Sequence, residues 1–361
     1  MIPLSGKRNP NHKMRTRRTP RFSSFGLLSF PLSGIIRILL LLFLGVLNLG
    51  AAESTSTVIV VVGAPGEPEF GSNFVHQADL WKKACSDAHR REVVIGLDTA
   101  APTNDYELLR QTLASEPTNS PAELWLVLIG HGTFDGKEAR FNLRGPDFSA
   151  TELAAWLKPF QRPLAIIDET SSSAPFLNKL SGTNRVVITA TRSGYEQNFT
   201  RFGQYFAEAI TAPEADLDKD GQVSLLEAFL MASRRAAEFY KVEGRLATEH
   251  ALLDDNGDGL GTPADWFRGL RAVKKPKESA PVDGLLAQQF VLLRNNAERQ
   301  FTPEQRAQRD ALERAVLLHR EKKGQMPEDE YYSELENLLV KLAKFYEETG
   351  TNQPASPPPG T

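Results

Sequence analysis

The apolar run Leu124–Ile129, which ends in Gly-His-Gly, constrains the fold of this chain more than any other segment. An uninterrupted apolar run bounded by polar segments is typical of a fully buried strand. Glycine on both sides of His131 allows the backbone to turn sharply. We therefore expect His131 at the carboxyl edge of a sheet, which is where open α/β folds bind ligands. The alternative is a glycine turn that carries a surface histidine.

A second buried run, residues 164–167, ends in a polar segment that is rich in hydroxyl groups. That segment reads Asp168-Glu-Thr-Ser-Ser-Ser-Ala174. A histidine at the end of one strand and hydroxyl groups at the end of the next suggest a pair of base and nucleophile. A serine-rich loop that caps the following helix is the alternative.

Apolar runs alternate with helical stretches from residue 57 to residue 210. The runs expected to form strands are residues 57–62, 92–97, 124–129, 164–168 and 185–191. The stretches expected to form helices are residues 74–90, 105–114, 149–157, 175–180 and 201–210, with a small hairpin at residues 137–145. Ser149 and Glu152 have the spacing of a capping box. Strands that alternate with helices predict an α/β fold with a mainly parallel sheet and helices on both faces.

Residues 1–52 have the composition of an export signal. They contain eight lysine and arginine residues and no acid, and an apolar run from Ile38 to Leu49 precedes Gly50-Ala-Ala52. This order predicts a cleaved signal peptide, and therefore a secreted or periplasmic protein. The alternative is that residues 32–52 stay attached and anchor the protein in a membrane.

The charge and the cysteine content exclude several classes of function. Removal of residues 1–52 lowers the 42 lysine and arginine residues by eight, to 34, against 45 acidic residues, so the net charge becomes −11. That charge argues against nucleic acid or an anionic membrane surface as the partner. Cys85 is the only cysteine, so the chain has no disulfide framework and no thiolate zinc site.

The segment from Asp216 to Glu227 has the residue order of a calcium-binding loop. Carboxylates occupy positions 1, 3 and 5, glycine occupies position 6 and glutamate occupies position 12. Alternate residues point oxygens inward, glycine allows the sharp turn, and the final glutamate closes the shell with two oxygens. The expected ligands are Asp216, Asp218, Asp220, Gln222 and Glu227. An acidic turn that needs no metal is the alternative.

A second segment, residues 254–265, repeats this scheme less completely. Its expected ligands are Asp254, Asn256, Asp258 and Asp265. Pro263 and the shorter final acid depart from the pattern. Together the two segments predict that residues 212–272 form a region with EF-hand-like loops that bind calcium.

The chain after residue 272 is expected to be largely helical. A charged linker, residues 273–281, precedes a predicted helical hairpin of residues 282–349 and a disordered tail of residues 350–361. Apolar residues at a spacing of four and three predict a seam against another helix, for which residues 302–322 are the expected partner. The residues of this seam are Tyr331, Leu335, Leu338, Leu342 and Phe345. The hairpin is also a candidate surface for self-association.

Three stretches between residues 57 and 210 resemble the legumain-like cysteine peptidases, a family within the wider caspase-like fold. Asn73-Phe-Val-His-Gln-Ala-Asp79 is similar to the family's Asn-Tyr-Arg-His-Gln-Ala-Asp, and His131-Gly matches its catalytic His-Gly. Residues 169–174 fall where the family has Glu-Ala-Cys-x-Ser-Gly. The resemblance implies a caspase-like fold for residues 53–211. The site residues that it implies are His131, Ser171, Asn73 and Glu169 for catalysis, and Val75 and Ser193 for substrate binding.

The departures from this family concern the residues that carry its chemistry. Ser171, or Thr170 if the match shifts by one residue, replaces the nucleophilic cysteine, and Val75 replaces an arginine that contacts the substrate. A serine hydroxyl needs a base that is backed by a buried carboxylate, whereas Asn73 is neutral. Two losses at one site predict an inactive peptidase fold, which acts as a calcium-stabilised binding or scaffold module for a peptide or protein. The alternative is an active hydrolase with Ser171 as nucleophile and His131 as base.

Overall fold

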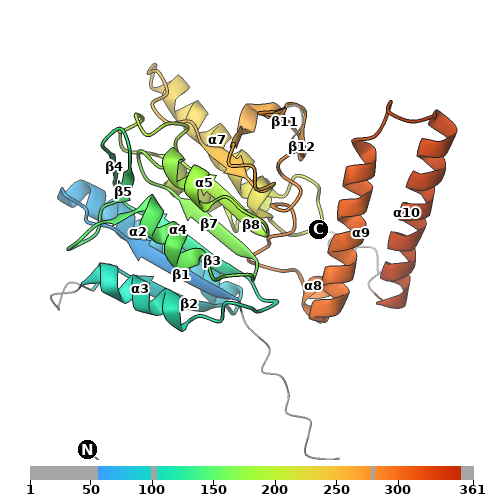
Figure 1. Ribbon diagram of the computed structural model, residues 1–361, viewed down its shortest axis with the longest axis horizontal. Coiled ribbons are helices and arrows are strands. Elements are labelled where there is room, and N and C mark those ends of the chain that lie inside the picture. The colour runs from blue at the N-terminus through green and yellow to red at the C-terminus, as the bar shows by residue number, and fades with distance from the viewer. Residues whose placement is uncertain (1–55, 99–103, 278–280, 351–361) are drawn as a thin grey trace, which may run out of the picture. The chain divides into compact units, whose positions relative to one another are not determined.

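A computed structural model describes residues 56–98, 104–277 and 281–350 of the chain (Figure 1). The predicted export segment, residues 1–52, lies outside the described residues, as does the predicted tail from residue 351 onward. The chain divides into a unit Met1–Glu53 and a unit Ser54–Thr361, and all features below belong to the second unit. Within the described residues, no helix has both the length and the apolar character needed to cross a membrane.

A seven-stranded sheet forms the centre of the fold. Its strands, in spatial order, are β10 (Thr262–Pro263), β9 (Leu252–Asp254), β8 (Arg185–Thr189), β7 (Leu164–Asp168), β3 (Leu124–Ile129), β1 (Thr57–Val62) and β2 (Arg91–Ile95). The strands from β8 to β2 run parallel to one another, and β9 and β10 add an antiparallel edge. The predicted α/β class with a mainly parallel sheet is confirmed.

The order of the parallel strands creates a ligand-binding position at one edge of the sheet. β1 lies between β2 and β3, and the chain then continues outward through β7 and β8, so the direction of winding reverses between β1 and β3. Doubly wound sheets bind their ligands outside the carboxyl ends of the strands at such a switch point. Pro65 follows β1 and His131 follows β3, so both residues lie at this position.

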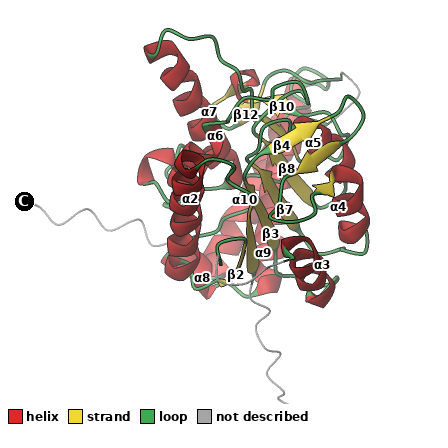
Figure 2. Ribbon diagram, turned by 90° about the vertical axis from the view of Figure 1, so that its left-hand side faces the viewer, coloured by secondary structure: helices red, strands yellow, loops and turns green. Residues whose placement is uncertain are grey.

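Helices cover both faces of the sheet, because the central strands are apolar on both sides. One face packs against α2 (Pro68–Asp87), α6 (Phe202–Ala209) and α7 (Leu225–Val242). The other face packs against α3 (Asp105–Ser115), α4 (Ala150–Leu157) and α5 (Ala174–Leu180). Figure 2 shows α2 on one side of the strands and α3 and α4 on the other. The predicted helical layers on both faces are therefore confirmed.

Two helix starts show how local sequence sets the boundaries. α2 begins at Pro68, earlier than the expected residue 74, because a proline in the first turn loses no hydrogen bond through its missing N–H. α4 begins at Ala150, directly after the predicted capping box, in which Ser149 and Glu152 bond to each other's backbone N–H.

Several short elements lie outside the central sheet. The hairpin expected at residues 137–145 is part of a three-stranded sheet of β4 (Gly132–Phe134), β5 (Ala139–Phe141) and β6 (Phe148–Ser149). Two further short strands, β11 (Phe267–Arg268) and β12 (Arg271–Ala272), pair with each other. The 3-10 helices η1 (Pro213–Ala215) and η2 (Ala264–Trp266) flank the acidic segments.

β9 and β10 extend the central sheet beyond residue 211, the expected end of the α/β domain. Leu253 of β9 pairs with Ile188 of β8 and is fully buried. The expected domain therefore contains five of the seven strands of the sheet. We did not predict β9 as a strand, since it is only three residues long and its last residue, Asp254, begins an acidic loop.

The described chain is mainly helical from Asn296 onward, whereas residues 282–295, the start of the predicted hairpin, form no helix and instead pack into the core through Ala287, Phe290 and Leu292. It contains α8 (Asn296–Gln300), α9 (Pro303–Arg320) and α10 (Glu328–Glu348), and α9 and α10 lie side by side (Figure 1). Tyr331 and Phe345 of the predicted seam are buried. Tyr346 of α10 donates a hydrogen bond of 2.9 Å to Glu313 of α9. The seam on α10 therefore packs against the helix that the sequence predicts.

We expect Ile166→Ala to lower the free energy of unfolding by about 2–5 kcal/mol, because it opens a cavity in the central strand β7. Ile166 is 1% exposed. The matched control is Val242→Ala, whose side chain is 77% exposed and whose loss should change stability by less than about 0.5 kcal/mol. Urea unfolding followed by circular dichroism measures both. Equal losses for the two variants would contradict the burial of β7.

Candidate functional site

His131 is held by a backbone carbonyl at the switch point of the sheet. Its Nε2 lies 3.1 Å from the carbonyl oxygen of Pro65, in the loop after β1. Because a carbonyl can only accept, Nε2 carries the proton in the neutral ring and Nδ1 is left as the basic nitrogen. The rings of Phe70 and Phe74 pack edge-on against the imidazole, with centroids 4.9 and 5.2 Å away. The ring therefore has a fixed orientation and tautomer.

Ser171 lies in the turn after β7 and contacts the peptide groups of Gly132. Its hydroxyl donates to the Gly132 carbonyl at 3.0 Å and accepts from the Gly132 N–H at 3.2 Å. A Cβ atom at position 132 would lie 2.1 Å from the Ser171 carbonyl oxygen, so only glycine fits there. The next residue, Ser172, has a φ of 57°, which is unusual for a residue other than glycine.

The structure brings Ser171 next to Gly132, the residue that follows His131. Among the described residues, however, the hydrogen bonds of the Ser171 hydroxyl go to Gly132, and none joins it to His131. Thr170, the alternative nucleophile, is fully buried and donates its hydroxyl to Asp168 at 2.6 Å. Among the described residues, neither hydroxyl is hydrogen-bonded to His131.

Asn73 does not contact His131 through a hydrogen bond. Its side chain instead bonds to Gln204 at 3.3 Å and to Gln77. The group that orients His131 is the carbonyl of Pro65, which sequence analysis did not find. A backbone carbonyl has no side-chain signature, and proline at position 65 gave no indication of this contact.

Glu169 is buried beneath the turn together with its neighbour Asp168. Glu169 is 3% exposed and Asp168 is fully buried. Burial raises the pKa of Asp168 to about 7, although hydrogen bonds from Thr170 oppose this shift. Burial also raises the pKa of Glu169 well above its usual range, and a negative charge on Asp168 raises it further. Glu169 therefore lies beneath the turn, where its side chain is almost inaccessible to solvent.

The two expected substrate-binding residues lie on different elements. Val75 is on α2 and its side chain is 44% exposed. Ser193 is in the loop after β8, where its hydroxyl accepts from the backbone N–H of Tyr195 at 3.1 Å. This loop reaches the turn of Ser171, because the N–H of Ser172 donates to the Glu196 carbonyl at 2.8 Å.

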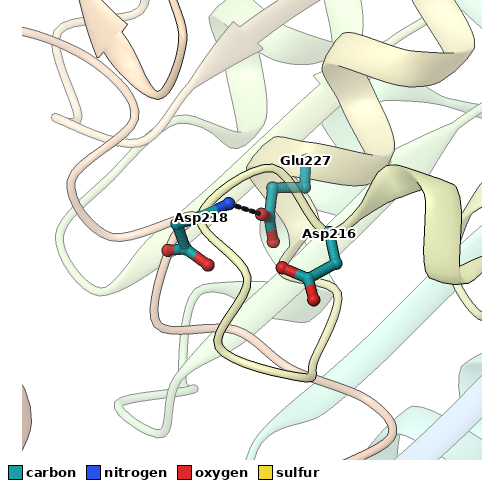
Figure 3. Close-up of side chains that lie close together, drawn as sticks. All are labelled: Asp216, Asp218 and Glu227. Atoms are coloured by element: carbon teal, nitrogen blue, oxygen red, sulfur yellow. Dashed lines mark hydrogen bonds between the residues drawn. The ribbon is translucent and has the colours of Figure 1, made fainter. Parts of the chain in front are cut away.

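The first acidic loop gathers three carboxylates at one point (Figure 3). One oxygen each of Asp216, Asp218 and Glu227 lie within 4.8 Å of one another. Glu227 is in the first turn of α7, where its Oε1 accepts from the N–H of Leu217 at 2.7 Å. Carboxylate oxygens at this separation suit a calcium ion, which takes several oxygen ligands.

Asp220 and Gln222 of the first loop are hydrogen-bonded to each other. Asp220 accepts from the backbone N–H of Gln222 at 2.8 Å and from its side-chain amide at 3.1 Å. The Gln222 side chain in turn accepts from the backbone N–H of Asn295 at 3.2 Å. These two expected ligands therefore contribute to the shape of the loop and to its contact with the start of α8.

Both acidic loops fold through the same pattern of hydrogen bonds at their first residue. Asp216 accepts from the N–H groups of the fourth and sixth residues of its loop, at 2.6 and 3.1 Å. Asp254 does the same in the second loop, at 3.0 Å each. Asn256 and Asp258 also accept from the N–H two residues further on, at 2.8 Å each. The second segment is therefore a structural repeat of the first.

The two loops differ in the acid that closes them. Glu227 accepts from the N–H groups of the second and third residues of the first loop, at 2.7 and 3.4 Å. In the second loop, Asp283 accepts from the corresponding N–H groups, at 3.1 and 3.3 Å. The expected ligand Asp265 is exposed and takes no part in these bonds within the described residues. Asp283 lies too far along the chain for a loop motif to include it.

The chain has partial similarity to solved caspase structures. The Drosophila initiator caspase Dronc matches at a TM-score of 0.39 and 13% identity, over 57% of this chain and 81% of that one. Caspase-1 from Spodoptera frugiperda matches at a TM-score of 0.36 and 9% identity, over 56% and 87%. A protein from Geobacter sulfurreducens matches at a TM-score of 0.33 and 13% identity, over 50% and 89%. No protein-family model and no curated protein matches the sequence.

We expect Gly132→Ala to lower the free energy of unfolding by about 1–3 kcal/mol, because the new methyl group overlaps the backbone of Ser171. The matched control is Gly182→Ala, where the nearest atoms to the added methyl group are 3.6 Å away on the flexible side chain of Arg185. That change should leave stability unchanged or raise it slightly. Thermal and urea unfolding of the two variants distinguish them, and equal stability would refute the close approach of Gly132 to Ser171.

Proposed function

We propose that this protein is a secreted, catalytically inactive relative of the legumain-like peptidases that binds a peptide or protein at the switch point of its sheet. The observation that carries this proposal is the set of hydrogen bonds made by the Ser171 hydroxyl. This hydroxyl bonds to both peptide groups of Gly132, while the nearby base is oriented by the carbonyl of Pro65. A carbonyl stabilises an imidazolium less than a carboxylate does, and a serine nucleophile depends on that stabilisation.

The absence of a cationic side chain at position 75 supports binding of an apolar ligand group over recognition of a polar one. Val75 is half-exposed on α2, where the legumain resemblance has arginine. Phe70 lies five residues earlier on the same helix and packs on Phe199 at 4.9 Å between ring centroids, beside His131. Aromatic rings and a valine side chain favour apolar contacts.

We further propose that calcium stabilises the region of residues 212–272. Support comes from the three clustered carboxylates of the first loop and from the repeated hydrogen bonds of the second. Asp216, Asp218 and Glu227 would hold the ion in the first loop, and Asp254 and Asp283 would hold it in the second. Bound calcium would neutralise these acids and fix the loops against α7 and β9. The role of calcium would therefore be to stabilise the fold of this region.

We expect the protein without residues 1–52 to show no peptide hydrolysis in the presence of calcium, whereas Ser171→Cys should gain measurable cleavage. A thiol reaches its anionic form near neutral pH and needs less help from the base. The double variant Ser171→Cys, Val75→Arg should extend cleavage to substrates with polar side chains. Fluorogenic peptides with and without a polar side chain before the cleaved bond measure this.

The control is His131→Ala in the Ser171→Cys background, which should abolish the gained activity. Cleavage by the unmodified protein, lost in His131→Ala, would refute the inactive assignment and identify Ser171 as a nucleophile. Labelling of Ser171 by a fluorophosphonate would lead to the same conclusion.

We expect calcium to raise the melting temperature of the protein, because a ligand at 100 times its Kd stabilises the folded state by about 2.7 kcal/mol. Glu227→Gln should remove most of this shift, while Glu238→Gln, on the exposed surface of the same helix, should keep it. Asp283→Asn should reduce the shift more than Asp265→Asn. Calorimetry and calcium titration measure both effects, and an unchanged melting temperature with calcium would refute the metal proposal.

A further inference from the structure

The turn that carries Ser171 rests on two adjacent buried acids, each with one oxygen that lacks a hydrogen-bond partner. Asp168 accepts through Oδ1 from the N–H and the hydroxyl of Thr170, at 3.1 and 2.6 Å, whereas its Oδ2 has no partner. Glu169 accepts through Oε1 from Trp81 at 3.4 Å, whereas its Oε2 has none. Both unpartnered oxygens are buried away from solvent.

No cation compensates these acids within the described part of the chain. The groups that face Glu169 are Trp81 and Gln77 from α2 and Gly203 from α6, and the only charge that acts on it is that of Asp168. Asp168 is faced by Thr170 and lies between β3 and β8, with Leu128 and Thr189 as its neighbours in the sheet. A carboxylate with an unpaired oxygen is costly in such surroundings, so each acid is more stable with its proton on.

The same turn depends on these acids for its shape. Asp168 fixes the backbone at Thr170, and the carbonyl of Glu169 accepts the Thr200 hydroxyl. On the outer side, the turn is held by the contacts of Ser171 with Gly132 and of Ser172 with Glu196.

We propose that Asp168 and Glu169 are uncharged positioning residues and that the Ser171 turn is a pH-sensitive element, closed while both acids carry protons and opened as they ionise. This holds whether the site binds a ligand or cleaves one, so it does not depend on the proposed function. In the closed state each acid accepts with one oxygen and keeps its proton on the other. In the open state the carboxylates are hydrated.

The direction of the pH dependence follows from the raised pKa values. Each acid titrates at a higher pH in the closed turn than in the open one, so protons stabilise the closed turn. This stabilisation is fully present below the ordinary pKa of about 4. The stabilisation by Asp168 is lost as the pH rises toward the pKa of this residue, which is about 7. The stabilisation by Glu169, whose pKa is raised well above its usual range, is lost over a range that extends to higher pH. The turn is therefore best ordered in acid.

Hydrogen exchange at the backbone amides of residues 168–174, followed by mass spectrometry from pH 5 to pH 7.5, tests this proposal. After correction for the intrinsic exchange rate, protection of the turn should fall by about tenfold per pH unit for each proton released. Helix α3, which packs against the edge strand β2 and against α4, is the internal reference and should show a smaller slope. Equal slopes for the turn and α3 would refute a local opening.

The double variant Asp168→Asn, Glu169→Gln keeps the accepting oxygens and removes both titrations, so its turn should show protection that is independent of pH. A slope that remains as in the unmodified protein would overturn the proposal. If this variant does not fold, ¹³C NMR of aspartate carboxyl carbons in the unmodified protein decides the matter. Titration near pH 7 of the signal assigned to Asp168 supports the inference, and titration of that signal below pH 5 refutes it.

Discussion

The contact between Gly132 and Ser171 joins the ends of two neighbouring parallel strands, and the rest of the site depends on it. The two backbones approach so closely that a side chain at position 132 would overlap the Ser171 carbonyl. In the same contact the Ser171 hydroxyl donates one hydrogen bond and accepts another. The contact that brings Ser171 close to the segment of His131 therefore also engages the Ser171 hydroxyl in hydrogen bonds with Gly132.

The chain uses acidic residues in two opposite ways. In the turn after β7, Asp168 and Glu169 are buried without a cation, and their protonated forms suit the apolar surroundings. In the two loops, Asp216 and Asp254 each accept from two backbone N–H groups and leave further lone pairs available for a cation. We propose that the first arrangement responds to protons and that the second holds a calcium ion.

The second loop links distant parts of the chain to the sheet. Asp254 ends β9, while Gly259 accepts from Asn178 at 2.7 Å and donates to Ser181 at 2.9 Å, at the end of α5. Asp283 closes the loop from a segment that leads to the C-terminal helices. An ion in this loop would therefore act on the sheet, on α5 and on that segment at once.

The sequence by itself determined the parallel strands, the helices on both faces, the glycine-flanked histidine at a strand end and the first acidic loop. Each of these depends on local periodicity or on residues within a dozen positions. Only the tertiary structure decided that Pro65 orients His131, that Ser171 is bonded to Gly132, and that Asp283 closes the second loop. These contacts join residues far apart in the chain, and two of them use a backbone carbonyl, which every residue possesses, so no pattern in the sequence distinguishes them.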